Sequence, residues 1–252
     1  MILSAHIADV GPRTAAGLLR DRPERRVDGL RYAEIALAAP LGAHLLPRLN
    51  LGRVGLIACW EQEAQLDRFL ANDPLAKRLS GGWHVRLQPL RMVGGWRELE
   101  DLPNSGDPAG DDEPVAIITL ARFRHSQLPR FLRASAGAEG QAVGDPALVA
   151  STGLGRPPRF AATFSLWRSV AEMRAYVTGR QGPEHAAAMR QHAAKPFHHE
   201  SAFLRFRPYG AEGTWDGREP LSEAQRAGTD LQAEPARAAS GAEALLLGDE
   251  LG

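Results

Sequence analysis

The chain has 252 residues, and its 30 lysines and arginines balance 30 aspartates and glutamates, so the formal net charge is zero. That balance argues against a nucleic-acid-binding protein, which needs a basic surplus to contact phosphates. An apolar fraction of 44% and a charged fraction of 24% are ordinary for a globular domain. Cys59 is the single cysteine, which excludes an intrachain disulfide and a zinc site made of several cysteines.

The sequence shows no segment that would insert into a membrane. No apolar run approaches the ~20 residues that a membrane-spanning helix needs. The first ten residues also lack the basic start and long apolar stretch of a secretory signal. We therefore expect a cytoplasmic protein, and peripheral contact with the inner face of the membrane stays open.

Two segments differ in composition from the rest of the chain. Residues 97–114 hold seven acids, three prolines and two glycines, which predicts an acidic linker. Residues 216–252 are rich in alanine, glycine and glutamate and contain no aromatic residue, which predicts a disordered tail. These segments define a first body, 1–96, and a second body, 115–215.

The two bodies resemble each other in order and spacing. Each begins with an apolar, strand-like run and has a later strand that ends in tryptophan, Trp60 or Trp167. Each closes with a frame of eleven residues, 86–96 and 205–215, in which arginine, proline, glycine and tryptophan fall in the same register. Several coincidences in the same order indicate an internal duplication. The alternative is that two unrelated α+β units converged on one pattern.

A helix is expected after each tryptophan. Its apolar positions lie at identical offsets in the two bodies and have the i, i+3, i+4 spacing of one helix face: Leu66, Phe69 and Leu70 in the first, Met173, Tyr176 and Val177 in the second. Ser169 and Glu172 have the spacing of a capping box.

The resulting order, strand–helix–strand–strand–helix–strand, is typical of a ferredoxin-like unit. The middle strand is expected near 44–49 in the first body and near 147–152 in the second. Helices cover one face of such a sheet, so its other face must be buried elsewhere. Two copies can cover each other, which predicts an α+β fold: tandem ferredoxin-like repeats that form an intrachain dimeric α/β barrel. The space between the sheets is the expected ligand cavity.

The halves differ most between the second helix and the last strand, where the second body is longer. Its segment 182–201 contains four of the eight histidines. A helix is expected from Pro183 to just before Pro196. His185 and His192 would lie ~10.5 Å apart along it, too far to share one small metal ion. A single axial haem ligand needs no second histidine. The simpler interpretation is a surface helix with scattered histidines.

These segments resemble the spheroidene monooxygenase family of carotenoid ketolases. The second body resembles it best, through GLGRPPRFAATFSLWRSVAEMRAYV (153–177), GPEHAAAMRQHAAKPFHHESAFLRF (182–206) and AEGTW (211–215). The first body resembles it more loosely, through RYAEIALA (31–38), GLIACW (55–60) and WHVRLQPL (83–90). The resemblance covers about residues 1 to 215 and rests on order and spacing.

The resemblance implies a dimeric α/β barrel that contains haem and inserts oxygen from O2 into an apolar substrate such as an acyclic carotenoid, with electrons from an unidentified donor. It implies that His185, which follows the Gly182-Pro183 pair after Glu184, is the haem iron ligand. Arg205 and Arg207 lie two apart on a strand, so they share a face on which they could bind haem propionates. The aromatic candidates for the pocket are Phe164, Trp167, Phe203 and Phe206.

Other functions stay open. Arg205 and Arg207 could simply be solvated, and the aromatic residues could be core. The same barrel could house a monooxygenase that works without haem, or a non-enzymatic carrier of haem or another small molecule, because fold does not decide function. His84 and His125 are unranked candidates for a distal group. The sequence shows no nucleophile elbow and no phosphate-binding loop, and it leaves the oligomeric state open.

Overall fold

A computed structural model describes residues 1–42, 49–103, 109–123, 143–158, 160–178 and 198–227. The elements of the first half are β1 (Ile2–Asp9), α1 (Pro12–Leu18), the 3-10 helix η1 (Pro23–Arg25), β2 (Leu30–Ala39), β3 (Arg53–Trp60), α2 (Glu63–Asn72), α3 (Pro74–Leu79) and β4 (Trp83–Gly95). A short 3-10 helix, η2 (Arg97–Leu99), follows. The elements of the second half are β5 (Val115–Phe123), β6 (Leu148–Arg156), β7 (Phe160–Trp167), α5 (Val170–Thr178) and β8 (His198–Gly213).

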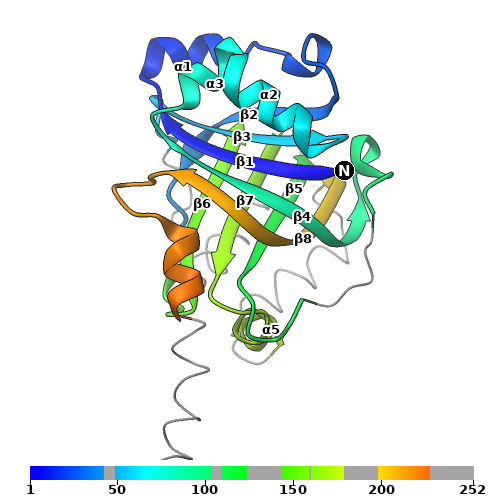
Figure 1. Cartoon of the computed structure of the whole chain (residues 1–252), viewed down its shortest axis with the longest axis vertical. Helices are drawn as coiled ribbons and strands as arrows, with labels where there is room; N and C mark the ends of the chain where they lie inside the picture. The colour runs from blue at the N-terminus through cyan, green and yellow to red at the C-terminus, as the bar shows by residue number, and fades with distance from the viewer. Residues whose placement is uncertain (43–48, 104–108, 124–142, 159, 179–197, 228–252) are drawn as a thin grey trace, which may run out of the picture.

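The strands close into one barrel in the order β1-β3-β2-β6-β7-β5-β8-β4, with antiparallel neighbours. Each half contributes four consecutive strands of this order. The halves meet where β2 pairs with β6 and where β4 pairs with β8. Helices α1, α2 and α3 lie together on the first half, whereas α5 lies at the opposite end of the molecule (Figure 1). The predicted α+β fold with an intrachain α/β barrel is confirmed.

The middle strand of the first half is not where the sequence predicted it. It is β2, which pairs with β3 from Leu30 opposite Trp60 to Leu37 opposite Val54. Its run LRYAEIALAA is almost wholly apolar because the strand is central and buried on both faces. The expected position, 44–49, falls mostly outside the described residues. The corresponding prediction for the second half, near 147–152, is confirmed by β6.

The acidic linker and the tail are more ordered than their composition suggested. Leu99, Leu102 and Ala109 of the linker are buried, because its few apolar residues pack on the barrel. The prediction of disorder from residue 216 is wrong for 216–227, where a helix occupies 220–227 and buries Leu221 and Ala224. A short helix is marginal alone, so this packing is what stabilises it. Residues 228–252 lie outside the described residues.

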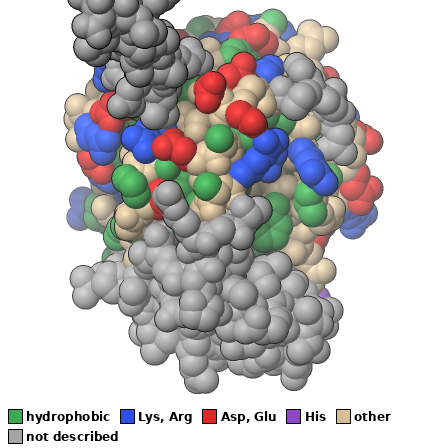
Figure 2. Space-filling view, turned by 90° about the horizontal axis from the view of Figure 1, so that it is seen from below, with side chains coloured by type: hydrophobic (Ala, Val, Ile, Leu, Met, Phe, Trp, Pro, Cys, Tyr) green, Lys and Arg blue, Asp and Glu red, His purple; other side chains and the backbone are tan. Residues whose placement is uncertain are grey.

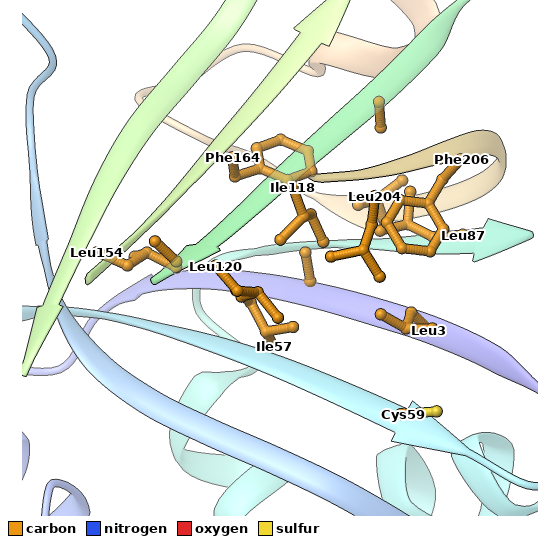
Figure 3. Close-up of a cluster of buried hydrophobic side chains, with 14 of the residues drawn as sticks. Leu3, Ile57, Cys59, Leu87, Ile118, Leu120, Leu154, Phe164, Leu204 and Phe206 are labelled. Atoms are coloured by element: carbon orange, nitrogen blue, oxygen red, sulfur yellow. The ribbon is translucent and has the colours of Figure 1, made fainter. Parts of the chain in front are cut away.

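Apolar side chains from both halves fill the interior of the barrel (Figure 3). Trp83 of the first half packs against Phe164 of the second, with ring centroids 5.8 Å apart. Leu154 of the second half lies over Gly55 of the first, where an added Cβ would stand 2.3 Å from its Cδ2 atom. The expected ligand cavity between the sheets is therefore wrong for the described residues. Two apolar faces whose side chains contact each other in this way form a core.

The outer face of the first half is fully covered. Leu66 and Phe69 of α2 are buried against it, and the ring of Phe69 lies 5.0 Å from that of Trp60. In the second half Met173 and Tyr176 of α5 are buried as predicted, but Val177 is 48% exposed. The Ser169 hydroxyl accepts the Glu172 N–H at 3.1 Å, which is the first bond of the predicted capping box.

Charged side chains at the described surface are largely paired. Arg53 bridges the first strand to the C-terminal segment, with contacts of 2.6 Å to Asp9 and 2.5 Å to Asp216. Figure 2 shows basic and acidic side chains next to each other on the described part of one face. Among the described residues, no helix has both the length and the apolar character to cross a membrane.

A buried polar group under α2 predicts how stability depends on pH. The Trp60 indole donates to the Ser4 hydroxyl at 3.0 Å, and that hydroxyl lies 3.0 Å from Nε2 of His6. Burial, and then the nearby His84, lower the pKa of His6 to about 3. The unfolded chain holds a proton on this residue below about pH 6.5, whereas the native protein does not. Stability is therefore complete above that pH and falls as the pH decreases.

We expect His6 to lower the free energy of unfolding by about 1.4 kcal/mol for each pH unit below its pKa in the unfolded chain. Urea unfolding of the wild type and His6→Gln at about pH 7.5 and about pH 5 isolates this contribution. Burial raises the pKa of Glu34 to about 7, which acts in the opposite direction, but both proteins contain Glu34. Equal pH dependence in the two proteins would contradict the prediction.

Candidate functional site

The two halves present equivalent outer faces that carry different side chains. In the first half one cross-strand row runs Ile35, Leu56, His6 and His84 over β2, β3, β1 and β4. Ile35, Leu56 and His6 are at most 3% exposed, because the helices of that half lie on them. The face is therefore filled by protein.

The equivalent row of the second half is Gly153, Thr163, Thr119 and Phe203 over β6, β7, β5 and β8. Both threonines and Gly153 are half-buried, although they lie in the middle of a sheet. Most neighbouring outward positions are also small, except Ile117, which packs under α5. The small ones form what we call the small-residue floor: Thr119, Ala121, Ser151, Gly153, Gly155, Ala161, Thr163 and Ser165. Side chains of the sheet thus occupy much less space on this face than on its counterpart.

Apolar side chains border the small-residue floor on two sides. Added Cβ atoms on Gly153 and Gly155 would lie 3.3 Å from Leu41 and 3.0 Å from Leu49, so these leucines lie beside the floor at its β6 edge. At the β8 edge Phe203 pairs with Val93 of β4, and the two side chains are 48% and 51% exposed. A flat apolar molecule on the floor would contact side chains at both edges.

The charged groups of the two outer faces also differ. Arg86 of β4 contacts Glu63 at 2.9 Å and Asp67 at 2.7 Å, both on α2. Arg205 holds the equivalent place in the second half, and the structure shows no ion pair or hydrogen bond between its side chain and the other described residues. Burial lowers the pKa of the Arg205 guanidinium, and the nearby Arg174 and Arg91 lower it further.

The structure brings together only some of the residues predicted to form the site. Phe203, Arg205 and Arg207 share the outer face of β8, as their spacing predicted. Arg207 is engaged, because its Nε donates to Glu113 at 2.9 Å. Phe164 is fully buried inside the barrel, so Phe164 and Phe203 do not line one pocket.

The remaining candidates fall in three places. Phe206 is buried inside the barrel, and Trp167 packs against Tyr176 of α5 with ring centroids 4.9 Å apart. His84 stacks on His6 in the first half, which places it on the opposite outer face. His185 and His125 lie outside the described residues. Within the described ranges, no three His, Cys, Asp or Glu side chains gather as a metal site.

The small-residue floor was not predicted from the sequence. A signal was present, because residues at the same distance before Trp60 and Trp167 occupy equivalent positions. Leu56 and Thr163 both stand four residues before the tryptophan, and Val54 and Ala161 both stand six before it. Comparison of the halves position by position would have shown that one face had lost its large side chains.

The chain is similar in sequence to known enzymes over most of its length. It is 32% identical over 243 residues to a spheroidene monooxygenase of Rubrivivax gelatinosus. The alignment covers 85% of this chain and 92% of that relative. The chain belongs to the spheroidene monooxygenase family. A second spheroidene monooxygenase, from Rhodobacter capsulatus, is 29% identical over 191 residues, covering 72% of this chain and 77% of that protein. No family model matches.

Membership in the spheroidene monooxygenase family makes this chain a monooxygenase, an oxidoreductase that uses O2 and a small-molecule substrate. Among solved structures, an anthrone oxidase-like protein is 13% identical and covers 87% of this chain and 94% of its own, with a TM-score of 0.33. That likeness is distant, and the barrel described above rests on the pairing of this chain's own strands.

Proposed function

We propose that this monooxygenase of the spheroidene monooxygenase family binds haem over the small-residue floor and inserts one oxygen atom from O2 into a long apolar substrate such as an acyclic carotenoid. The observation that carries the proposal is the contrast between the two outer faces. One face is filled by large side chains and helices, and the other has kept small residues over three strands. The names of the relatives support a carotenoid as the substrate class.

The described residues suit a porphyrin in polarity. A porphyrin is flat, apolar over most of its area and anionic at one edge. The small-residue floor has apolar side chains at both borders, and Arg205 carries a charge beside it with no counterion among the described residues. Haem sites combine an apolar pocket, an axial ligand and a few polar groups in the same way.

His185 would hold the iron. It lies seven residues after Thr178, the last residue of α5, in the segment that leads to β8. Both ends of that segment belong to the half that contains the small-residue floor. When bound, haem supplies the activation of O2. The chain supplies an apolar surface, the orientation of the substrate and the exclusion of water. The second oxygen atom leaves as water, so each turnover needs two electrons from an external donor.

The visible spectrum of the purified protein tests the proposal. We expect protein produced with sufficient iron and haem precursor to show a Soret band, and His185→Ala to lose it or shift it. His192→Ala, a histidine of the same segment, is the matched control and should keep the band. A colourless wild type that takes up no added haemin but still oxidises its substrate would instead indicate a monooxygenase that works without haem. Oxygen uptake with an acyclic carotenoid then tests the substrate class.

The border residue Phe203 is expected to contribute to substrate affinity. Its ring is 48% exposed, so Phe203→Ser should change the free energy of unfolding by less than about 1 kcal/mol. Loss of its apolar contact should weaken the binding of an apolar substrate about 10-fold. Titration with a carotenoid, followed by tryptophan fluorescence, measures the affinity of the wild type and of Phe203→Ser. Unchanged affinity would place the substrate elsewhere.

A further inference from the structure

Because the chain is duplicated, the surroundings of Arg205 can be compared with those of Arg86, the equivalent residue of the first half. In the first half Arg86 is neutralised by Glu63 and Asp67, which are the third and seventh residues after Trp60. The third and seventh residues after Trp167 are Val170 and Arg174. The second half thus has the arginine but neither acid, and a cation stands at the position of Asp67.

The reversed charge lies close to the arginine. Among the described residues, Arg174 on α5 and Arg91 on β4 are the charged groups that shift the pKa of Arg205, and all three are cations. Arg91 is the direct cross-strand neighbour of Arg205. Arg174 also contacts Asp111 at 2.6 Å, so it is held in place by a residue outside this cluster. A half-buried guanidinium beside other cations is unfavourable unless an anion joins it.

We infer that Arg205 is a carboxylate-binding residue at the edge of the small-residue floor, beside the positive charges of Arg174 and Arg91, and that it receives an acidic group of the bound ligand. Under the proposed function, on which this inference rests, that group is a haem propionate. Arg207, which sequence analysis paired with Arg205, is not part of the site because Glu113 and Gln88 already engage it. A guanidinium matches a carboxylate with two parallel hydrogen bonds, so Arg205 suits this ligand class.

The first test needs no ligand. Removal of an uncompensated charge should stabilise the protein without haem, so Arg205→Gln is expected to raise the melting temperature. The matched control is Arg86→Gln, which leaves Glu63 and Asp67 without their cation and should lower it. If Arg205→Gln lowers the melting temperature as much as Arg86→Gln does, Arg205 is a structural residue and the inference is wrong.

The second test measures binding of metal-free protoporphyrin IX and of its dimethyl ester, which lacks free carboxylates. We expect Arg205→Gln and Arg174→Asp to weaken the binding of protoporphyrin IX about 10- to 100-fold and to leave the affinity for the ester unchanged. Arg86→Gln should bind both porphyrins as the wild type does. Equal losses for acid and ester, or no loss at all, would overturn the inference.

The two proposals can fail separately, because the porphyrin probe contains no iron. If protoporphyrin IX binds through Arg205 but haemin shows no spectral change that depends on His185, the carboxylate site stands and haem ligation fails. If haemin is ligated by His185 with the same affinity in Arg205→Gln, the haem proposal stands and the carboxylate site fails. If the wild type binds neither porphyrin, both are wrong.

Discussion

Trp83→Ala is expected to reduce the free energy of unfolding by about 3–5 kcal/mol. Trp83 is 1% exposed inside the barrel, where its ring contacts Phe164 and Trp215 at centroid distances of 5.8 and 5.7 Å. Its indole N–H also donates to Glu219 at 3.0 Å. Truncation would leave a large cavity between the halves and remove a contact that holds the C-terminal helix at 220–227.

Urea unfolding followed by far-UV circular dichroism measures this loss. Trp83→Phe is the matched variant, because it keeps most of the ring contacts and removes only the hydrogen bond and part of the volume. We expect it to cost about 1–2 kcal/mol. Because the ring bridges both halves, Trp83→Ala should keep one cooperative transition at a lower midpoint. Two separate transitions would show that the halves fold independently. A cost below that of Trp83→Phe would contradict the expected loss of packing between the halves.

The barrel was predictable from the sequence because the pattern of strands and helices that forms it occurs twice along the chain. Trp60 and Trp167 fix the register of the two copies, and the apolar positions that follow them fix the helices. A ferredoxin-like sheet with one bare apolar face has few alternatives to packing against a second one. The closing pairs β2–β6 and β4–β8 follow from that requirement.

Elements whose stability comes from distant contacts were harder to predict. The helix at 220–227 has little apolar surface of its own, and it forms because Leu221 and Ala224 pack on the barrel while Glu219 bonds to Trp83. The linker was misjudged for the same reason. Composition averages over a segment, whereas two or three buried side chains decide whether it is ordered.

The candidate site was predicted in part. The spacing of Arg205 and Arg207 correctly placed both on one face. The assignment of Phe164 and Phe203 to one pocket was wrong, because both faces of these strands carry apolar residues. The neighbours Ile117 and Ile118 point to opposite sides of β5, and sequence alone cannot show which side is the barrel interior. Only the pairing of all the strands decides it.

Thr163→Trp is expected to abolish haem binding, which is the largest functional effect that a single change in the described residues should have. Thr163 lies at the centre of the small-residue floor, between Gly153 and Thr119 on the neighbouring strands. Its counterpart in the first half is Leu56, where a large side chain is packed under protein. An indole ring standing on the floor would occupy the space that a flat ligand needs, so both haemin and the porphyrin dimethyl ester should be excluded.

Thr163→Val is the matched control, because it changes the polarity of the floor but not its height and should keep the Soret band. Loss of both porphyrins distinguishes a blocked floor from the carboxylate site, where Arg205→Gln should affect only the acid. The side chain is half-buried, so Thr163→Trp should remain folded, and circular dichroism checks this. A folded Thr163→Trp protein with an unchanged Soret band would mean that haem binds elsewhere, and the contrast between the two outer faces would then need another explanation.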